Sequence, residues 1–203
     1  MTWMLDMNGG NPCLAWMGED HVNLDLMATA LSRINRFNGR TLRPYSVAEH
    51  CVLVMEVMQR DLGMRSPTAL LAGLLHRAHA AHTGDLDVAM SQLLGAVWAT
   101  EEQRIRWCVL KHFGVSGAWS TYREQIEQAD GMVTATARLQ LQPDQFDPTY
   151  DQHKPITWLR LGDAGCWEPQ DWQDVFTAQV HALALAIEAG QPPRVEAQEA
   201  PAA

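Results

Sequence analysis

The chain has 203 residues, of which 15 are Lys or Arg and 24 are Asp or Glu, so its formal net charge at pH 7 is −9. Hydrophobic residues make up 47% and charged residues 19%, which is typical of a globular chain and not of a disordered one. The acidic balance argues against binding of a nucleic-acid duplex, but it is compatible with a small phosphorylated ligand. The length predicts one domain, over residues 1–190.

Cysteine usage and the first residues bear on the cellular compartment. The four cysteines form no C-x-x-C pair, which is typical of reduced thiols in the cytoplasm. The stretch MTWMLDMNGGNPC contains an acidic residue, Asp6, and no apolar core, so we expect no signal peptide. No apolar run approaches the ~20 residues that a membrane span needs. We therefore expect a soluble, cytoplasmic protein with no membrane partner.

The first half of the chain shows helical periodicity. Apolar residues at spacings of three and four predict a helix over residues 22–35, and the sequence RFNGRTLRPY ends it. A second helix begins at a capping box, Ser46 with Glu49, and runs to about Leu62. Ser66-Pro67 predicts the start of a third helix. That helix, TALLAGLLHRAHAAH, is apolar nearly all round at first, so we expect it in the centre of the core until it ends near Thr83.

The second half predicts three more helices. They cover Thr100, with Gln103 as a capping box, to Phe113, then residues 120–141, then residues 169–189. Residues 142–168 read as a surface loop, and residues 191–203 as a disordered tail. No segment reads as a strand. The sequence pattern therefore predicts an all-α fold in one domain.

Three polar residues occupy helical positions where the pattern favours apolar ones: His50, His76 and Asp130. Two histidines and a carboxylate from three separate helices could converge on a metal ion. A histidine in a core and a solvated aspartate also have ordinary structural roles. Spacing alone leaves both interpretations open.

Three sequence blocks, RPYSVAEHCVLVMEVM, ALLAGLLHRAHAAHTGDL and EQAD, resemble in order and spacing the HD-domain phosphohydrolases. They are most similar to the branch of bacterial 5′-deoxynucleotidases and phage nucleotide hydrolases. The resemblance covers roughly residues 21–141 and implies an all-α HD-domain bundle of six to eight helices with its core over that span. It also implies metal-dependent hydrolysis of phosphate esters of deoxynucleotides and a possible homodimer. It implies His50, His76 and Asp130 as ligands of a divalent Mn, Co, Zn, Mg or Fe ion.

The same resemblance implies further site residues. The stretch SRINRFNG is similar to the family segment in which an arginine and an aromatic residue contact the nucleotide. It implies Arg36 and Phe37 as substrate-binding residues, with Arg33 as the rival arginine. Asp85 matches the last acid of the family pattern HDAxEAxxGD, which implies a catalytic role.

The chain departs from this family pattern at two positions that carry chemistry. Arg77 stands where the metal-binding aspartate is expected, and Ala80 where the catalytic glutamate is expected. At ~4 Å and an effective dielectric constant near 20, each pair of unit charges is worth about 4 kcal/mol, so Arg77 opposes a cation strongly. Arg77 can instead pair with Asp130 or Asp85, or bind a phosphate with its forked donors.

Two functions therefore stay open. The first is a catalytically silent relative, a pseudoenzyme, that binds a deoxynucleotide, another small phosphorylated ligand or a protein partner. The second is an active phosphohydrolase with a remodelled metal site made of His50, His76, His79 and Asp130. The losses at Arg77 and Ala80 favour the first for this chain.

Overall fold

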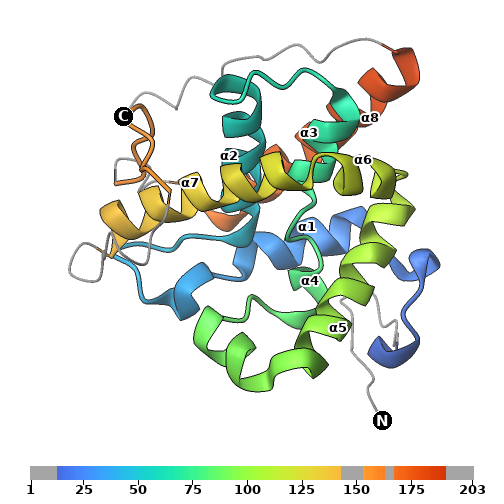
Figure 1. The fold of residues 1–203 in the computed structure, drawn as a ribbon, viewed down its shortest axis with the longest axis horizontal. Coiled ribbons are helices and arrows are strands. Elements are labelled where there is room, and N and C mark those ends of the chain that lie inside the picture. Colours follow the sequence, from blue (N-terminus) through green and yellow to red (C-terminus); the bar gives the residue numbers. More distant parts are fainter. Residues whose placement is uncertain (1–12, 143–152, 163–166, 191–203) are drawn as a thin grey trace.

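The computed structural model describes residues 13–142, 153–162 and 167–190, and within these ranges it holds eight α-helices, three short 3-10 helices and no strand (Figure 1). The α-helices are α1 (Leu24–Arg33), α2 (Val47–Arg60), α3 (Pro67–Leu74), α4 (Ala80–Thr83), α5 (Val88–His112), α6 (Ser116–Thr121), α7 (Arg123–Leu141) and α8 (Pro169–Ala189). The 3-10 helices are η1 (Leu14–Trp16), η2 (Glu19–His21) and η3 (Arg36–Gly39). The prediction of an all-α fold with six to eight helices is confirmed for these residues.

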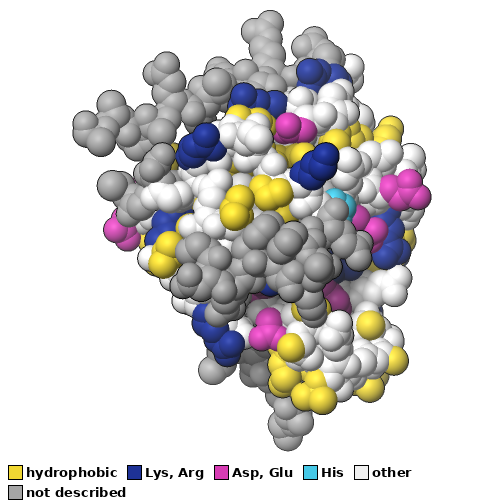
Figure 2. Space-filling model, turned by 60° about the vertical axis from the view of Figure 1, so that its left-hand side comes forward, with side chains coloured by type: hydrophobic (Ala, Val, Ile, Leu, Met, Phe, Trp, Pro, Cys, Tyr) yellow, Lys and Arg dark blue, Asp and Glu magenta, His cyan; other side chains and the backbone are white. Residues whose placement is uncertain are grey.

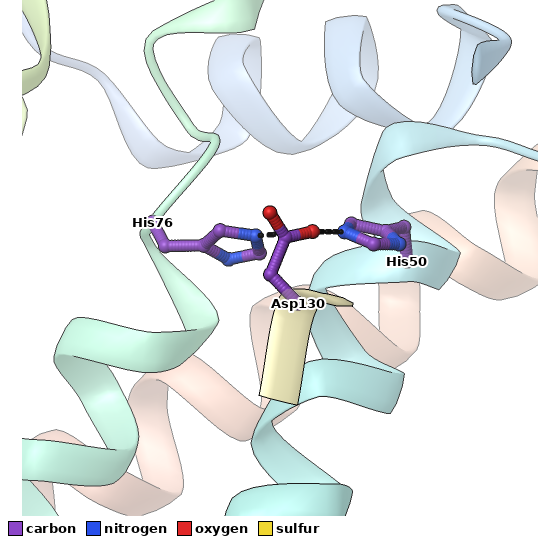
Figure 3. Close-up of side chains that lie close together, drawn as sticks. All are labelled: His50, His76 and Asp130. Carbon is purple, nitrogen blue, oxygen red and sulfur yellow. Dashed lines mark hydrogen bonds and ion pairs between the residues drawn. The ribbon is translucent and has the colours of Figure 1, made fainter. Parts of the chain in front are cut away.

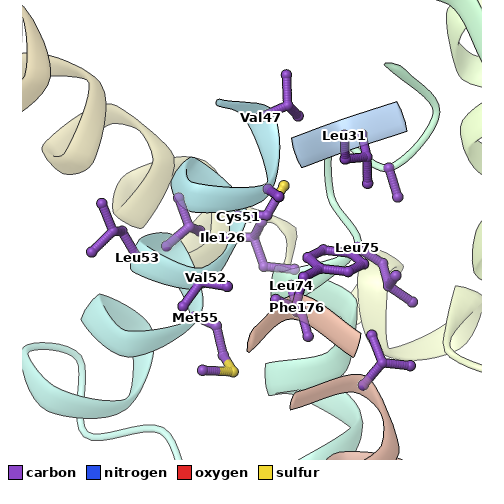
Figure 4. Packing of buried hydrophobic residues seen from close by; sticks show 14 of the residues in the cluster. Leu31, Val47, Cys51, Val52, Leu53, Met55, Leu74, Leu75, Ile126 and Phe176 are labelled. Atoms are coloured by element: carbon purple, nitrogen blue, oxygen red, sulfur yellow. The ribbon is translucent and has the colours of Figure 1, made fainter. Parts of the chain in front are cut away.

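Helix α2 is the centre of the bundle, because it packs against α1, α3, α7 and α8. Figure 1 shows α7 crossing α2, and Figure 4 shows the ring of Phe176 from α8 beside Leu74 at the end of α3. Residues Ala69–Leu74 of α3 are all buried, as its apolar composition predicts. Gly73 lets α3 approach α2 closely, since a Cβ there would overlap the side chain of Met58.

The helix starts that the sequence predicts at Ser46 and at Ser66-Pro67 are confirmed. Ser46 caps α2 by accepting a hydrogen bond from the backbone N–H of Glu49 at 3.1 Å, and Ser66 caps α3 ahead of Pro67. The reciprocal half of the predicted capping box does not form. The Glu49 carboxylate instead accepts a hydrogen bond from Nη1 of Arg43 at 2.9 Å.

The third helix is shorter than predicted. It ends at Leu74, residues 75–79 form turns, and α4 begins at Ala80. Backbone hydrogen bonds in the turns span three residues, for example from Ala80 N–H to the carbonyl of Arg77 at 2.9 Å. Nδ1 of His76 also lies 2.7 Å from the carbonyl oxygen of Gly73, which ends the helical hydrogen-bond ladder there. The His76-Arg77 pair therefore lies in a turn and not on a straight helix.

The predicted helix start at Thr100 is wrong. Helix α5 begins at Val88, where Asp87 caps it by accepting from Met90 N–H at 2.8 Å. Thr100 lies inside the helix, and its hydroxyl donates to the carbonyl of Ala96 at 2.8 Å. A break at Gly95, with φ 59° and ψ −137°, divides α5 in two, and only glycine adopts this conformation readily.

The last two long helices match their predicted ranges closely, and α8 ends at Gly190 in a left-handed conformation. Of the predicted loop 142–168, residues 142, 153–162 and 167–168 are described and contain no helix. The predicted tail 191–203, the N-terminal stretch 1–12 and Cys166 lie outside the described residues. The three cysteines that are described are free thiols. None of the described helices has the length and apolar character needed to cross a bilayer.

Candidate functional site

The three polar residues singled out above meet in space. His50 comes from α2, His76 from the turn after α3, and Asp130 from α7 (Figure 3). Oδ1 of Asp130 lies 2.7 Å from Nε2 of His50 and 3.6 Å from Nε2 of His76. One ligand atom from each residue falls within 4.8 Å of the others, so by position this His–His–Asp cluster could hold a metal ion.

The hydrogen bonds of His50 define its protonation. Its side chain is fully buried, and a carboxylate only accepts, so Nε2 carries the proton that is donated to Asp130. Nδ1 then accepts from Nη1 of Arg36 at 2.7 Å and from the hydroxyl of Tyr45 at 3.0 Å. Burial and the nearby Arg36 charge hold the pKa of His50 well below its ordinary value, so the ring is neutral.

His76 has the opposite arrangement. Its Nδ1 donates to the carbonyl of Gly73, which leaves an unprotonated Nε2 directed at Asp130. This Nε2 is buried and has no hydrogen-bond partner. Burial lowers the pKa of His76 and Arg77 lowers it further, although Asp130 opposes both. A backbone carbonyl on one ring nitrogen and a free lone pair on the other is the usual arrangement of a metal-binding histidine.

Arg77 points into the cluster. Its Nη2 lies 3.0 Å from Oδ2 of Asp130, and its Nη1 lies 3.5 Å from Oδ1 of Asp85. Burial would raise the pKa of Asp130, but the Arg77 charge and the hydrogen bond from His50 outweigh it and hold this pKa well below its ordinary value. Asp130 is therefore an anion paired with a guanidinium.

A second guanidinium, Arg36, closes the cluster from the other side. Its Nε lies 3.4 Å from Oδ2 of Asp85, and Nη1 also donates to the hydroxyl of Thr134 at 3.2 Å. An isolated antiparallel β-bridge between Asn35 and Ser46 positions Arg36 beside the cluster. The backbone N–H of Arg36 donates to the carbonyl of Tyr45 at 2.8 Å. Arg36 and Arg77 face Asp85 and Asp130. Because both histidines are neutral, the cluster together with these contacting side chains has no net charge.

Of the two remaining residues that the resemblance implies, Phe37 lies next to Arg36 in the chain and Arg33 does not. Phe37 follows Arg36 in a left-handed conformation, φ 54°, that is rare for a bulky residue and concentrates at ligand-binding positions. Its ring stacks on Tyr45, with centroids 6.2 Å apart. Arg33 is an exposed residue at the end of α1. Of the two rival arginines, Arg36 is the one that contacts His50.

His79, a ligand in the remodelled-site alternative, belongs to a different contact. Its Nε2 lies 3.0 Å from Oε1 of Glu102, which also accepts from Nη2 of Arg106 at 2.7 Å. His79 holds the pKa of Glu102 down to about 2. The metal-capable group found in the described part of the chain contains His50, His76 and Asp130 without His79.

Sequence reasoning missed several side chains that complete the site. Thr134 lies one helical turn after Asp130, a spacing that could have signalled it. The role of Tyr45 depends on the fold of the loop before α2, and nothing local indicates it. His153 packs on Gly131, beside Asp130, so closely that a Cβ at Gly131 would overlap its ring. No sequence signal links these two residues.

Burial of histidines near the site predicts acid sensitivity. The pKa of His82 is lowered to about 4 by burial, while an unfolded histidine titrates near 6.5. The unfolded chain therefore binds this proton first, and the free energy of unfolding falls as the pH drops from about 6.5 to about 4. We expect His82→Gln to reduce that fall by about 1 to 2 kcal/mol, at roughly 1.4 kcal/mol per pKa unit and allowing for partial exposure.

Urea unfolding of both proteins at pH 7 and pH 4.5 measures this difference. His181→Gln, which changes an exposed histidine of α8, is the matched control and should leave the decline as it is. An equal loss of stability on acidification in wild type and His82→Gln would contradict the prediction.

Fold and site together define the chain as an all-α protein with a buried His–His–Asp cluster that two arginines contact. No family model matches it. It is 27% identical over 125 residues to the uncharacterized protein YfdR of Escherichia coli K12, a match that covers 62% of this chain and 64% of YfdR. Because YfdR is itself uncharacterized, this distant similarity brings no activity to the chain.

Proposed function

We propose that this chain is a relative of the HD-domain phosphohydrolases that has lost metal-dependent hydrolysis and binds a deoxynucleotide or similar small phosphorylated ligand without turnover. The order and spacing of the three sequence blocks support the family. The convergence of His50, His76 and Asp130 from three elements is the arrangement that such a protein requires.

The single observation that carries the loss of hydrolysis is the ion pair between Arg77 and Asp130, 3.0 Å apart. The carboxylate that would be needed to bind a cation is already neutralised by a guanidinium, which does not lose its proton. With two arginines and two aspartates, the cluster is neutral as it stands, and a divalent ion would bring two uncompensated positive charges.

Arg36 opposes a metal ion as well. It donates to Nδ1 of His50, so the ring proton lies on Nε2, the nitrogen that would have to bind the ion. Moving this proton to Nδ1 would direct it at the Arg36 guanidinium. By position the three side chains are suitable for a metal ion, but by charge and protonation they do not fit one.

A general base is also missing from the expected place. Ala80 is fully buried and replaces the glutamate of the family pattern. Asp85 and Asp130 are the carboxylates of the cluster, and guanidinium groups contact both. Asp130, whose pKa is held well below its ordinary value, is a poor proton acceptor.

Ligand binding is supported by the loose contacts of Asp85. Its 3.4 and 3.5 Å distances to Arg36 and Arg77 are longer than the 2.7–2.9 Å typical of charge-assisted hydrogen bonds. Nε of Arg77 is buried without a hydrogen-bond partner. A phosphate oxygen can therefore compete for these donors, and the strained Phe37 beside them offers an aromatic face to a base.

Calorimetric titration of the purified chain with deoxynucleoside mono- and triphosphates tests the proposal, together with a phosphate-release assay and elemental analysis. We expect binding without phosphate release and no tightly bound divalent ion. Arg36→Gln should weaken binding at least tenfold, a loss of about 1.4 kcal/mol. Arg40→Gln, a change at an exposed neighbour outside the cluster, should bind as wild type does.

The same assays separate the second candidate function. The metal-like geometry of His76 is the observation in its favour. One tightly bound ion per chain together with phosphate release would establish the active phosphohydrolase and refute the silent relative. Failure of every nucleotide to bind would refute the ligand part of the proposal.

A further inference from the structure

The stretch between Gly84 and Gly95 is set off from the rest of the fold by a glycine at each end. Gly84 has φ 76° and Gly95 has φ 59°, and a Cβ built on either would contact nothing within 4 Å. Glycines in open space let the backbone turn at low cost. We call residues 85–94 the α5 segment. It comprises Asp85, the helix cap Asp87 and the first half of α5, and it can turn as one unit at the two glycines.

The α5 segment contributes no buried residue to the hydrophobic core. The buried residues of α5 all lie in its second half, namely Ile105, Val109 and Leu110. Before the break, Leu93 is 78% and Leu94 is 45% exposed. Figure 1 shows this half-helix at the lower edge of the molecule, and Figure 2 shows hydrophobic side chains gathered at the same height. Packing therefore holds the α5 segment only weakly.

Polar contacts with the candidate site hold the α5 segment in place. Asp85 pairs with Arg36 and Arg77, and Asp87 accepts a hydrogen bond from the side-chain amide of Asn38 at 2.6 Å. Within the described part of the chain, these are the hydrogen bonds and ion pairs through which side chains of the α5 segment reach the rest of the fold. The position of the segment therefore depends on what the two guanidinium groups bind.

Asp85 lies where a phosphate would bind. Its carboxylate offers one negative charge and two oxygens to Arg36 and Arg77, at 3.4 and 3.5 Å. A phosphate monoester offers three oxygens and nearly two negative charges, so it is the better partner for two forked guanidinium groups. A carboxylate beside a bound phosphate is also repelled, because their charges are alike. Asp85 and a phosphate therefore exclude each other at the two arginines.

We infer that Asp85 is an internal substitute for the phosphate of the ligand, and that binding of a phosphate monoester expels Asp85 and releases the α5 segment. The released segment turns at Gly84 and Gly95 and carries exposed apolar side chains such as Leu93 with it. Occupancy of a largely buried cluster is thereby converted into a change at the surface, so the protein acts as a ligand sensor. This inference rests on the proposed function for its ligand and adds an output to it.

Coupling of this kind is reciprocal. The factor by which the docked Asp85 weakens ligand binding equals the factor by which the ligand weakens docking of Asp85. Changes that loosen the α5 segment should therefore strengthen ligand binding, even where they leave the charge of the cluster unaltered. This consequence separates a coupled segment from an aspartate that only repels the ligand.

Hydrogen exchange of the ligand-free full chain tests whether Asp85 holds the α5 segment. In Asp85→Asn we expect the amides of residues 88–94 to exchange about tenfold faster than in wild type, while those of α2 and α7 stay protected. Asn38→Gly, which alters no charge and suits the left-handed backbone there, should accelerate the same amides. Asp174→Asn, at an exposed aspartate of α8, is the matched control and should leave them unchanged.

Calorimetric titration with inorganic phosphate and with deoxynucleoside monophosphates tests the part of the ligand. We expect Asp85→Asn to bind about tenfold more tightly than wild type. Saturating ligand should accelerate the exchange of residues 88–94 in wild type by about the same factor. Asn38→Gly should also bind more tightly, although it removes no negative charge from the cluster.

Three results would overturn the inference and leave the proposed function standing. One is a folded Asp85→Asn chain in which residues 88–94 exchange as in wild type. Another is a wild-type chain that binds these ligands while the same amides exchange no faster. The third is tighter binding by Asp85→Asn but not by Asn38→Gly, which would reduce Asp85 to a repulsive charge. If no ligand binds to wild type or Asp85→Asn, the proposed function fails, and the sensor fails with it.

Discussion

Replacing Arg77 by aspartate is expected to convert the cluster into a divalent-cation site. The change leaves Arg36 facing three carboxylates, at residues 77, 85 and 130, so the cluster charge falls from zero to minus two and matches a divalent ion. At an effective dielectric constant near 20, a divalent ion about 4 Å from a unit charge gains or loses about 8 kcal/mol. Exchanging the guanidinium for a carboxylate reverses the sign of that interaction.

Elemental analysis and thermal unfolding with and without Mn²⁺ or Co²⁺ measure the effect. We expect one ion per chain in Arg77→Asp and a melting temperature that rises with the ion, neither of which we expect of wild type. Ala80→Glu alone is the control, because it adds a carboxylate but leaves Arg77 in place, and it should not acquire the ion. Only the double variant Arg77→Asp with Ala80→Glu is expected to release phosphate from deoxynucleotides.

Two outcomes would contradict this account of the lost activity. A folded Arg77→Asp chain that acquires no ion would show that the Arg77 guanidinium is not the deciding obstacle. Acquisition of the ion by Ala80→Glu alone would show that the cluster tolerates Arg77 beside a cation.

Arg77→Met is expected to lower the free energy of unfolding by about 2 to 3 kcal/mol at pH 7. Breaking a buried ion pair costs about 3–5 kcal/mol, and the side chains of Arg77 and Asp130, 24% and 22% exposed, place this pair slightly below that range. Methionine keeps the apolar length of the side chain but removes the guanidinium. The loss of stability therefore measures the effect of leaving the Asp130 carboxylate without its positively charged partner.

The pH dependence of this loss gives an independent check. The lowered pKa of Asp130 means that its ion pair stabilises the fold fully above the unfolded pKa of about 3.9 and loses this effect as the pH falls toward the folded value. The difference between wild type and Arg77→Met should therefore shrink below about pH 4. Urea unfolding at pH 7 and at pH 3 measures it.

The exposed pair Arg123–Glu127, at 2.7 Å on α7, provides the matched control. Its members are 60% and 55% exposed, so Arg123→Met should cost within about 0.5 kcal/mol. Equal losses for the two methionine variants, or a loss for Arg77→Met that does not change with pH, would mean that the Arg77–Asp130 pair is not the source of the stability.

Local features of the sequence were sufficient to predict the all-α class and the starts of α2 and α3. Ser46 and Ser66-Pro67 act within four residues, and the apolar run of α3 indicates a buried helix wherever it lies. The prediction of helix boundaries failed where contacts with residues far away in the sequence determine the backbone conformation. The turn at His76–His79 is stabilised by partners on α5 and α7, and the start of α5 depends on Asp87, a cap without the glutamate that would have marked it.

The sequence by itself determined that the chain is helical and that His50, His76 and Asp130 are the polar residues to consider, because periodicity, caps and motif spacing are local or ordered along the chain. Only the tertiary structure decided what these residues contact. Asp130 is 80 residues from His50 and 53 from Arg77, so their hydrogen bonds exist only once α2, the turn after α3 and α7 have packed. Packing also decided that Arg77 points inward, that His79 binds Glu102, and that the first half of α5 stays exposed, since each depends on which helices lie close enough to offer a partner.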